Sequence, residues 1–295
     1  MITISLCMIV KNEEDVLDRC LSSVEKAVDE LVIVDTGSVD QTRAIAERHH
    51  AKIYEFPWID DFAAARNYAF DQATQDFILW LDADDILPAD QLDKLIALKQ
   101  TLDERCDMVI MQYRTSFDKE GRPTFSFPRE RLIRRKAHLR WKGAVHETIP
   151  FVPRRYVSDI AIEHHKLHCA DPQRNLRILE KLKQAGTMDT RQRYYYAREL
   201  ADHQRYEEAL SEYELFLMDP AGWSENKIDA CLSMARCWHA LKQRQKEFSS
   251  LIQAFRYAPP RGEICCGLGR YFFIEKNWEC AVFWYQLATT LPLPL

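Results

Sequence analysis

Hydrophobic positions in the first third of the chain follow two alternating patterns. Four apolar runs, each suited to a buried strand, lie at 2–10, 31–34, 52–56 and 77–81. The segments that follow them, at 14–28, 40–49, 62–73 and 88–102, carry apolar residues at helical spacing. Strands that alternate with helices predict βαβ units and a mainly parallel sheet. We therefore expect an α/β fold whose ligand site lies at the carboxyl ends of the strands.

The pattern changes after residue 108. Apolar runs at 108–115, 125–135 and 156–162 predict an antiparallel extension of the sheet. From Asp171 onward every segment is typical of helices, and an offset of 72 aligns 206–213 with 278–285 around a degenerate middle copy. Such spacing indicates tetratricopeptide-like helix pairs. We expect a boundary near residue 170, with domains at 1–170 and 171–295.

Composition narrows the class of protein. A chain of 295 residues suggests about two domains. It has only 8 Gly, lacks GxxxxGK[ST], and places its one GxG after no strand, which argues against phosphate-loop and dinucleotide folds. Nine cysteines without a CxxC motif suggest reduced thiols. The first apolar run is too short to span a bilayer, so we expect no transmembrane segment and a cytoplasmic protein.

The net charge of −5 is unevenly distributed. The segment 114–142 contains ten Lys and Arg but only three Asp and Glu. This excess fits an anionic ligand, and it fits a salt-bridged surface hairpin equally well.

Three carboxylates directly follow the apolar run 77–81, in the sequence Asp82-Ala83-Asp84-Asp85. Because residues i and i+2 of an extended chain point the same way, Asp82 and Asp84 are expected to face one divalent cation. Oxygen ligands favour Mg²⁺ or Mn²⁺ on a substrate phosphate. The alternative is that Asp84 or Asp85 caps the helix that Pro88 opens.

Two further polar positions are candidates on the same side of the sheet. Asp35 follows the second apolar run and either binds a base or ribose or closes a turn. Arg66 lies in an alanine-rich helix, where it either binds phosphate or pairs with Asp60 or Asp61.

The later part of the first domain supplies a base and a third metal ligand. Glu147, in the stretch that begins at Trp141, is the candidate general base, and a structural tryptophan with a polar turn is the alternative. One of the imidazoles of His164, His165 and His168 is expected to join the ion at the acidic cluster. A closed zinc site with His165, His168 and Cys169 has unsuitable spacing.

Five motifs occur in one order along the chain: 9–13 (IVKNE), 34–38 (VDTGS), 65–67 (ARN), 81–85 (LDADD) and 141–147 (WKGAVHE). Together they resemble family 2 glycosyltransferases of the GT-A fold. The chain is most similar to bacterial members with tetratricopeptide-like repeats, such as peptide S-glycosyltransferases, and to lipopolysaccharide-core glucosyltransferases. The resemblance implies a Rossmann-like mixed sheet with helices on both faces, followed by an all-α repeat domain.

The resemblance also implies an activity. It is inverting, metal-dependent transfer from a UDP-sugar, such as UDP-glucose or UDP-N-acetylhexosamine, to an acceptor polypeptide or glycan, with nucleic acid left open. The implied donor-binding residues are Asn12, Glu13, Asp35, Arg66, Asp82 and Trp141. The implied ligands of Mn²⁺ or Mg²⁺ are Asp82, Asp84 and His164, and the implied catalytic residues are Glu147 and, as its alternate, His146. The repeats would present the acceptor or form a homodimer.

Two other classes compete with this interpretation. A nucleotidyltransferase usually carries a glycine-rich loop after its first strand, and residues 9–14 contain no glycine. A repeat-based binding protein with a dead catalytic domain would not need intact Asp82, Asp84 and Glu147.

Overall fold

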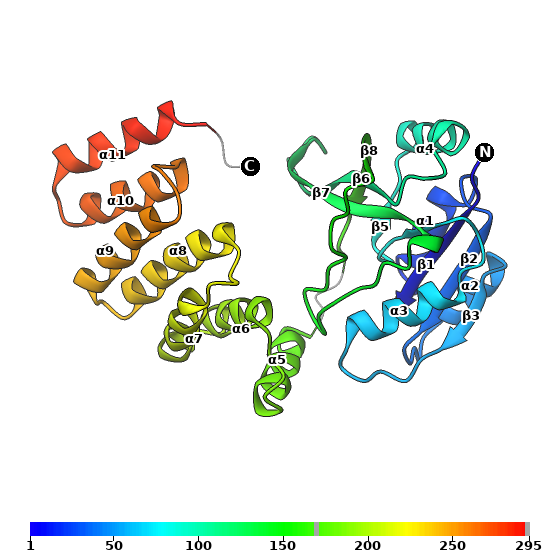
Figure 1. Cartoon of the computed structure of the whole chain (residues 1–295), viewed down its shortest axis with the longest axis horizontal. Helices are drawn as coiled ribbons and strands as arrows, with labels where there is room; N and C mark the ends of the chain where they lie inside the picture. Colours follow the sequence, from blue (N-terminus) through cyan, green and yellow to red (C-terminus); the bar gives the residue numbers. More distant parts are fainter. Residues whose placement is uncertain (168–170, 293–295) are drawn as a thin grey trace. The chain divides into compact units, whose positions relative to one another are not determined.

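The computed structural model describes residues 1–167 and 171–292, and the chain forms two compact units, Met1–Pro172 and Gln173–Leu295 (Figure 1). The expected domain boundary at residue 170 falls on residues outside those described, as do His168 and Cys169.

The first unit is built on one mixed sheet. Its strands are β1 (Ile4–Val10), β2 (Glu30–Asp35), β3 (Lys52–Glu55), β4 (Phe77–Trp80), β5 (Asp85–Ile86), β6 (Met108–Phe117), β7 (Pro123–Arg134) and β8 (Arg155–His164). The strand order is β3-β2-β1-β4-β7-β6-β8-β5. Strands β1 to β4 pair in parallel, and β7 joins β4 and β6 antiparallel. The expected antiparallel extension is therefore confirmed for β6 and β7, but it is wrong for β8, which pairs parallel with β6.

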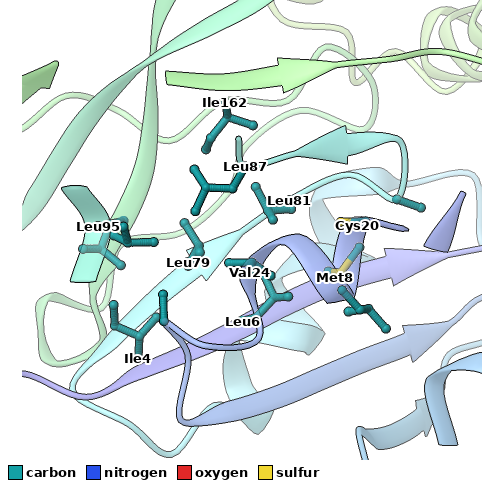
Figure 2. Close-up of a cluster of buried hydrophobic side chains, with 14 of the residues drawn as sticks. Ile4, Leu6, Met8, Cys20, Val24, Leu79, Leu81, Leu87, Leu95 and Ile162 are labelled. Atoms are coloured by element: carbon teal, nitrogen blue, oxygen red, sulfur yellow. The ribbon is translucent and has the colours of Figure 1, made fainter. Parts of the chain in front are cut away.

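Helices cover both faces of this sheet. They are α1 (Leu17–Val24), α2 (Thr42–Arg48), α3 (Phe62–Gln72) and α4 (Ala89–Thr101). Alternation along β1 separates the two cores: Leu6 and Met8 pack with α1, α2 and α4, whereas Cys7 packs with α3. Figure 2 shows the first of these clusters, in which Val24 and Cys20 of α1 lie against Leu6 and Met8. Apolar side chains thus pack against both faces of the sheet, and they fix the positions at which the parallel strands end.

The second unit is helical throughout its described residues. It contains α5 (Arg174–Gln184), α6 (Thr190–Asp202), α7 (Tyr206–Met218), α8 (Ser224–Ala240), α9 (Arg244–Gln253), α10 (Gly262–Ile274) and α11 (Trp278–Thr290). Helices α7 and α11 begin 72 residues apart, as the repeat predicts, and α9 begins between them. The pairs α6/α7, α8/α9 and α10/α11 are therefore three copies of one helical hairpin.

Small residues lie at the helix crossings of these hairpins. Ala197 and Ala235 are buried in α6 and α8, and Gly269 takes the same position in α10. A Cβ atom on Gly269 would lie only 2.8 Å from the ring of Tyr285. Helices α10 and α11 therefore approach each other too closely at this point for a larger residue.

The middle hairpin departs from the other two at one buried position. Where α7 has Ala209 and α11 has Ala281, α9 has Glu247, which is 0% exposed. His239 Nδ1 lies 3.0 Å from one Glu247 oxygen, which also accepts a hydrogen bond from Arg244. Arg270 of the following hairpin approaches the other oxygen at 3.8 Å.

Candidate active site

The acidic run Asp82–Asp85 lies where β4 ends, at the carboxyl edge of the parallel strands. The chain turns there and forms the two-residue strand β5, which pairs antiparallel with β8 so that Asp85 lies opposite His164. This pairing brings together residues 79 positions apart in the sequence.

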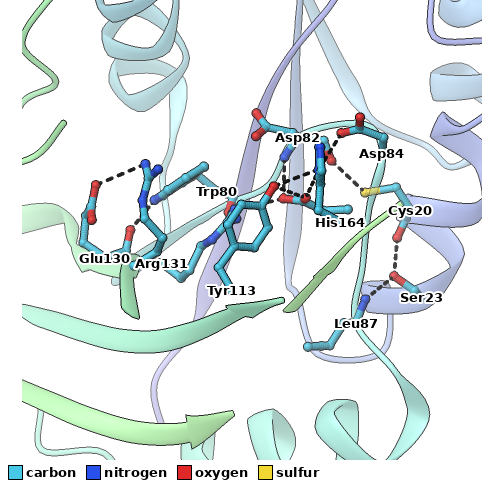
Figure 3. Close-up of polar contacts among 12 residues, drawn as sticks. Cys20, Ser23, Trp80, Asp82, Asp84, Leu87, Tyr113, Glu130, Arg131 and His164 are labelled. Carbon is cyan, nitrogen blue, oxygen red and sulfur yellow. Dashed lines mark hydrogen bonds and ion pairs between the residues drawn. The ribbon is translucent and has the colours of Figure 1, made fainter. Parts of the chain in front are cut away.

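Asp84, Asp85 and His164 form a cluster that could hold a metal ion (Figure 3). The His164 Nδ1 atom lies 3.3 Å from Asp84 Oδ1 and 3.2 Å from Asp85 Oδ1, and one potential ligand atom from each residue lies within 4.8 Å of the others. Burial lowers the pKa of His164, but hydrogen bonds and charges from the two aspartates raise it to about 10. Two carboxylates and an imidazole fit Mn²⁺ or Mg²⁺, and the protonated imidazole partly balances them without an ion.

Asp85 is held from three sides. Its Oδ2 accepts hydrogen bonds from Arg131 Nη1 at 2.9 Å and from the backbone N–H of Asp82 at 3.0 Å. Its Oδ1 accepts one from the Tyr113 hydroxyl at 2.8 Å. Arg131 and Asp85 are both 0% exposed, so this is a fully buried ion pair. Asp85 does not cap α4, whose N-cap, Pro88, has no side-chain hydrogen bond.

Asp82 turns away from this cluster and pairs with Arg66. The Arg66 Nη2 atom donates to Asp82 Oδ1 at 2.7 Å, and Arg66 Nε donates to Glu147 Oε1 at 2.7 Å. Burial raises the pKa of Asp82, but the charges of Arg66 and Arg131 outweigh it and lower that pKa to about 2. Arg66 therefore bridges the end of β4 and the predicted base, and it pairs with neither Asp60 nor Asp61.

Two indole rings enclose the Arg66 guanidinium. It lies 5.1 Å from the ring centre of Trp80 and 5.0 Å from that of Trp141. Trp141 is fixed by Asn67, which donates to its carbonyl at 3.0 Å and accepts from its N–H at 2.9 Å. The motif Arg66-Asn67 thus positions both Glu147 and Trp141 from a single turn of α3.

The predicted nucleotide residues lie at the ends of β1 and β2. Asp35 is buried, and its Oδ1 accepts from the N–H groups of Gly37 at 3.0 Å and Ser38 at 2.8 Å. Asp35 therefore closes a turn, one of the two roles expected for it. The other carboxylate oxygen of Asp35, Oδ2, lies 3.9 Å from Arg43 Nε. Asn12 has a left-handed backbone (φ 56°), which Asn tolerates better than most residues.

Hydrogen bonds tie the end of β1 to the loop after β2. The Asn12 N–H donates to Ser38 Oγ at 3.0 Å, and Asn12 Oδ1 accepts from the Val39 N–H at 2.8 Å. The Glu13 N–H donates to Thr42 Oγ1 at 2.7 Å. Asn12, Glu13 and Asp35 therefore form one structural group, and their contact with a nucleotide stays a prediction.

The structure thus assembles the predicted residues into three neighbouring groups. Asp84 and His164 meet Asp85; Asp82 and Glu147 meet Arg66, beside Trp141; and Asn12, Glu13 and Asp35 share a loop. His146 has a left-handed backbone (φ 53°) next to Glu147. Sequence reasoning missed Tyr113 and Arg131, and considered Asp85 only as a helix cap.

Most arginines in the basic segment 114–142 have acidic partners. Arg114 pairs with Glu163 at 3.1 Å, Arg122 with Asp118 at 2.7 Å, and Arg134 with Asp107 at 2.5 Å. Of the two interpretations of this segment, the structure shows the salt-bridged hairpin.

A mixed sheet with carboxylates clustered at the carboxyl end of a central parallel strand is an α/β arrangement suited to a phosphorylated ligand with a divalent cation. The family model described as glycosyl transferase family 2 matches residues 5–156, just over half of the chain. The chain belongs to this family. The expected family and the GT-A fold class, with a helical region after it, are confirmed.

Three curated relatives illustrate the range of similarity. A TPR repeat-containing protein of Synechococcus elongatus is 41% identical over 151 residues, which are 50% of this chain and 36% of the relative. The SPbeta prophage-derived glycosyltransferase SunS of Bacillus subtilis is 24% identical over 225 residues, 70% of this chain and 51% of that protein. A glycosyltransferase of Rickettsia felis is 37% identical over 92 residues, 31% of this chain and 32% of that protein. The chain spans from about a third to about half of these relatives.

Solved structures show a more distant likeness. Staphylococcus aureus TarS, residues 1–349, has a TM-score of 0.42 at 15% identity and covers 96% of this chain and 90% of its own. Glucosyl-3-phosphoglycerate synthase of Mycobacterium tuberculosis, in complex with Mn²⁺ and UDP-glucose, has a TM-score of 0.42 at 15% identity. The match covers 64% of this chain and 80% of the synthase chain. In this chain, no helix among the described residues is long and apolar enough to cross a membrane.

Proposed function

We propose that this chain transfers a sugar, with inversion, from UDP-glucose or a UDP-N-acetylhexosamine to an acceptor such as a peptide side chain. The observation that carries the proposal is the Asp84–Asp85–His164 cluster at the carboxyl end of β4, in a chain of glycosyl transferase family 2.

The cluster would hold a divalent ion through Asp84 and His164, with Asp85 beside them. When bound, such an ion supplies positive charge next to the diphosphate leaving group. Asp85 is already fixed by Arg131 and Tyr113, so the cluster is preorganised. Asp82, the other predicted ligand, would stay in contact with Arg66 and orient it toward the donor.

Glu147 is the proposed base. Arg66 Nε occupies its Oε1, which leaves Oε2 to accept the acceptor's proton as the acceptor attacks the sugar. His146 is the alternate base. A thiol acceptor with a low pKa would depend on this base less than a hydroxyl would.

Asp35, with Asn12 and Glu13, would bind the uracil or ribose. Asp35 Oδ1 is used by the turn, so recognition would fall to Oδ2, near Arg43. Trp141 would form an apolar wall beside the diphosphate, behind Arg66.

The test is UDP release from a panel of UDP-sugars with Mn²⁺ or Mg²⁺, together with UDP-dependent thermal shifts. We expect Asp84→Asn to lower turnover by about 100-fold or more and to weaken metal-dependent UDP binding. The exposed Asp103→Asn, on the loop after α4, is the matched control and should leave both unchanged. No donor turnover and no UDP-dependent stabilisation in the unaltered protein would contradict the proposal.

The base has its own test. Glu147→Gln should slow transfer by about 10² to 10⁴-fold and leave UDP binding intact, because Gln still accepts the Arg66 hydrogen bond. Loss of UDP binding in this variant would show that Glu147 has a different role.

Two further expectations accompany this proposal. Homodimer formation through the repeats is supported by α11, where Trp278, Val282 and Phe283 are 55%, 53% and 58% exposed. Sedimentation equilibrium would measure it. A cytoplasmic location stays a prediction from the sequence.

A further inference from the structure

One arginine recurs in each hairpin of the second unit. Arg198, Arg236 and Arg270 each follow directly on the small residue at the helix crossing of α6, α8 and α10. All three are exposed. Equivalent positions of stacked repeats lie on the same face of the array, so the three guanidinium groups form a row. We call these three residues the arginine row.

The first two members of the row open into one cavity. Its volume is about 260 Å³. Its lining includes Arg198, Arg236, Asp202, Tyr206, Tyr213 and Ser233. The cavity therefore offers two guanidinium groups, one carboxylate and three hydroxyl groups, and it is large enough for one or two side chains.

The partners of these arginines are mostly neutral. Arg198 Nη1 donates to the Tyr194 hydroxyl at 3.4 Å, a long hydrogen bond, and among the described residues no carboxylate oxygen lies within 4.0 Å of its guanidinium. Arg236 Nη2 donates to Ser233 Oγ at 2.6 Å, and the Asp229 carboxylate lies 4.0 Å away. The buried Tyr194 donates in turn to Asp229 at 2.7 Å, which fixes the tyrosine beside Arg198.

We propose that the arginine row binds an acidic segment of a partner polypeptide. A guanidinium presents a planar fork that matches a carboxylate with two hydrogen bonds, and Arg198 and Arg236 retain donors for it. Hydroxyl groups of the cavity suit the neutral parts of a peptide between its acidic side chains. None of these residues belongs to the candidate active site, so this site extends beyond the proposed function and its test is independent of turnover.

The charge of the unit favours a peptide over a nucleic acid. Residues 173–295 contain 17 Lys and Arg and 15 Asp and Glu, so the unit is close to neutral and the row is a local feature. Nucleic-acid binding depends on several phosphate contacts from a strongly basic surface.

The experiment measures peptide binding to the full chain by fluorescence anisotropy. The probe is a labelled 12-residue peptide of alternating Glu and Gly, compared with a Lys–Gly peptide and a 12-nucleotide single strand of dT. The test variant is Arg198→Gln with Arg236→Gln; Arg270 is left in place because it contacts the buried Glu247. We expect the Glu–Gly peptide to bind, and the double variant to weaken this binding by about tenfold or more, because glutamine cannot form charge-assisted hydrogen bonds with a carboxylate.

The matched control removes the same charge elsewhere in the unit. Lys242 and Lys276 occupy equivalent left-handed positions (φ 58° and 59°) at the turns of the second and third hairpins, and the first hairpin has Gln204 there (φ 61°). Lys242→Gln with Lys276→Gln should therefore fold normally and change binding less than about twofold. Circular dichroism checks the fold of all variants. Equal weakening by both pairs, tighter binding of the dT strand, or no binding of the acidic peptide would each overturn the proposal.

Discussion

Arg131 is the residue on which the order of the candidate metal cluster depends most. Its guanidinium lies 3.8 Å from the ring centre of Trp80 and 4.1 Å from that of Tyr113. Its Nη1 also donates to the Trp80 carbonyl at 3.2 Å. It thus joins the end of β4, strand β6 and Asp85 without contact with solvent.

Removal of Arg131 should destabilise the fold strongly. Arg131→Met removes the buried arginine partner of Asp85 and leaves only His164 to balance its charge, so we expect the free energy of unfolding to fall by about 3 kcal/mol. Urea unfolding of Arg131→Met, Asp85→Asn and the double variant measures this. The double variant should cost less than the sum of the single variants; additivity within about 0.5 kcal/mol would show that the pair is not coupled.

Glu30 predicts how stability changes with acid. Its carboxylate accepts hydrogen bonds from Lys52 Nζ at 2.7 Å and Ser5 Oγ at 2.5 Å, and from Thr74. Burial raises the pKa of Glu30, but these hydrogen bonds outweigh it and lower the pKa to about 2. Because this pKa is below the ordinary value of 4.5, the stabilisation is full above pH 4.5 and is lost as the pH falls toward 2.

Substitution of Glu30 should remove this acid sensitivity. From the pKa difference, the ionised group contributes on the order of 3 kcal/mol at neutral pH. Glu30→Gln should lower stability at pH 7 and flatten its dependence between pH 5 and 2, as measured by urea unfolding across that range. The exposed Glu104→Gln is the control, and an unchanged pH dependence in Glu30→Gln would refute the assignment.

Candidate site residues could be located from the sequence where they follow a regular strand. Asp84 and His164 could be found because they stand at the ends of apolar runs. Tyr113 and Arg131 could not, because β6 and β7 pair with register shifts, between Val109 and Ile110 for example. Each shift exchanges the inward and outward sides of a strand, so side-chain direction cannot be read by alternation there.

Helix α3 is the element that carries most of the second group of site residues. Asp61 caps it, with a side-chain oxygen that accepts from the Ala64 N–H at 2.8 Å. Arg66 and Asn67 follow one turn later, so the start of this helix sets where both side chains lie.

Loss of this cap should have a moderate cost. We expect Asp61→Ala to lower the free energy of unfolding by about 1 kcal/mol, and Asp61→Asn to recover most of it, because an amide oxygen also accepts at this position. Thermal unfolding measures both. Equal destabilisation by the two variants would mean that the charge of Asp61, not its capping bond, is responsible.

The elements themselves were largely readable from periodicity, with ends displaced by a few residues. The helix expected at 14–28 is only Leu17–Val24, whereas the strand expected at 156–162 extends over Arg155–His164. Strand β5 was missed, because two residues carry no periodic pattern and exist as a strand only through their pairing with β8. The same pairing sets Asp85 opposite His164. The sequence alone therefore did not identify Asp85 as the third member of the candidate metal cluster.

At the scale of the whole molecule, the two units have separate cores. The expected domains at 1–170 and 171–295 lead to a direct prediction. A fragment of residues 173–295 should unfold cooperatively by far-ultraviolet circular dichroism, with helical signal, because its buried side chains come from its own helices. A fragment of 1–172 is the companion. A non-cooperative or unstructured 173–295 fragment would contradict the division.

The buried Glu247 makes the three helical hairpins non-interchangeable. Its partners come from its own hairpin, His239 and Arg244, and from the next one, Arg270. Deleting the middle copy would set Arg270 against Ala209, the small residue that the first hairpin has where the middle one has Glu247. Repeat arrays commonly gain or lose whole copies. Here, however, the buried Glu247 is approached by an arginine from the hairpin that follows it. The succession of the middle and last hairpins is therefore constrained by electrostatics as well as by shape.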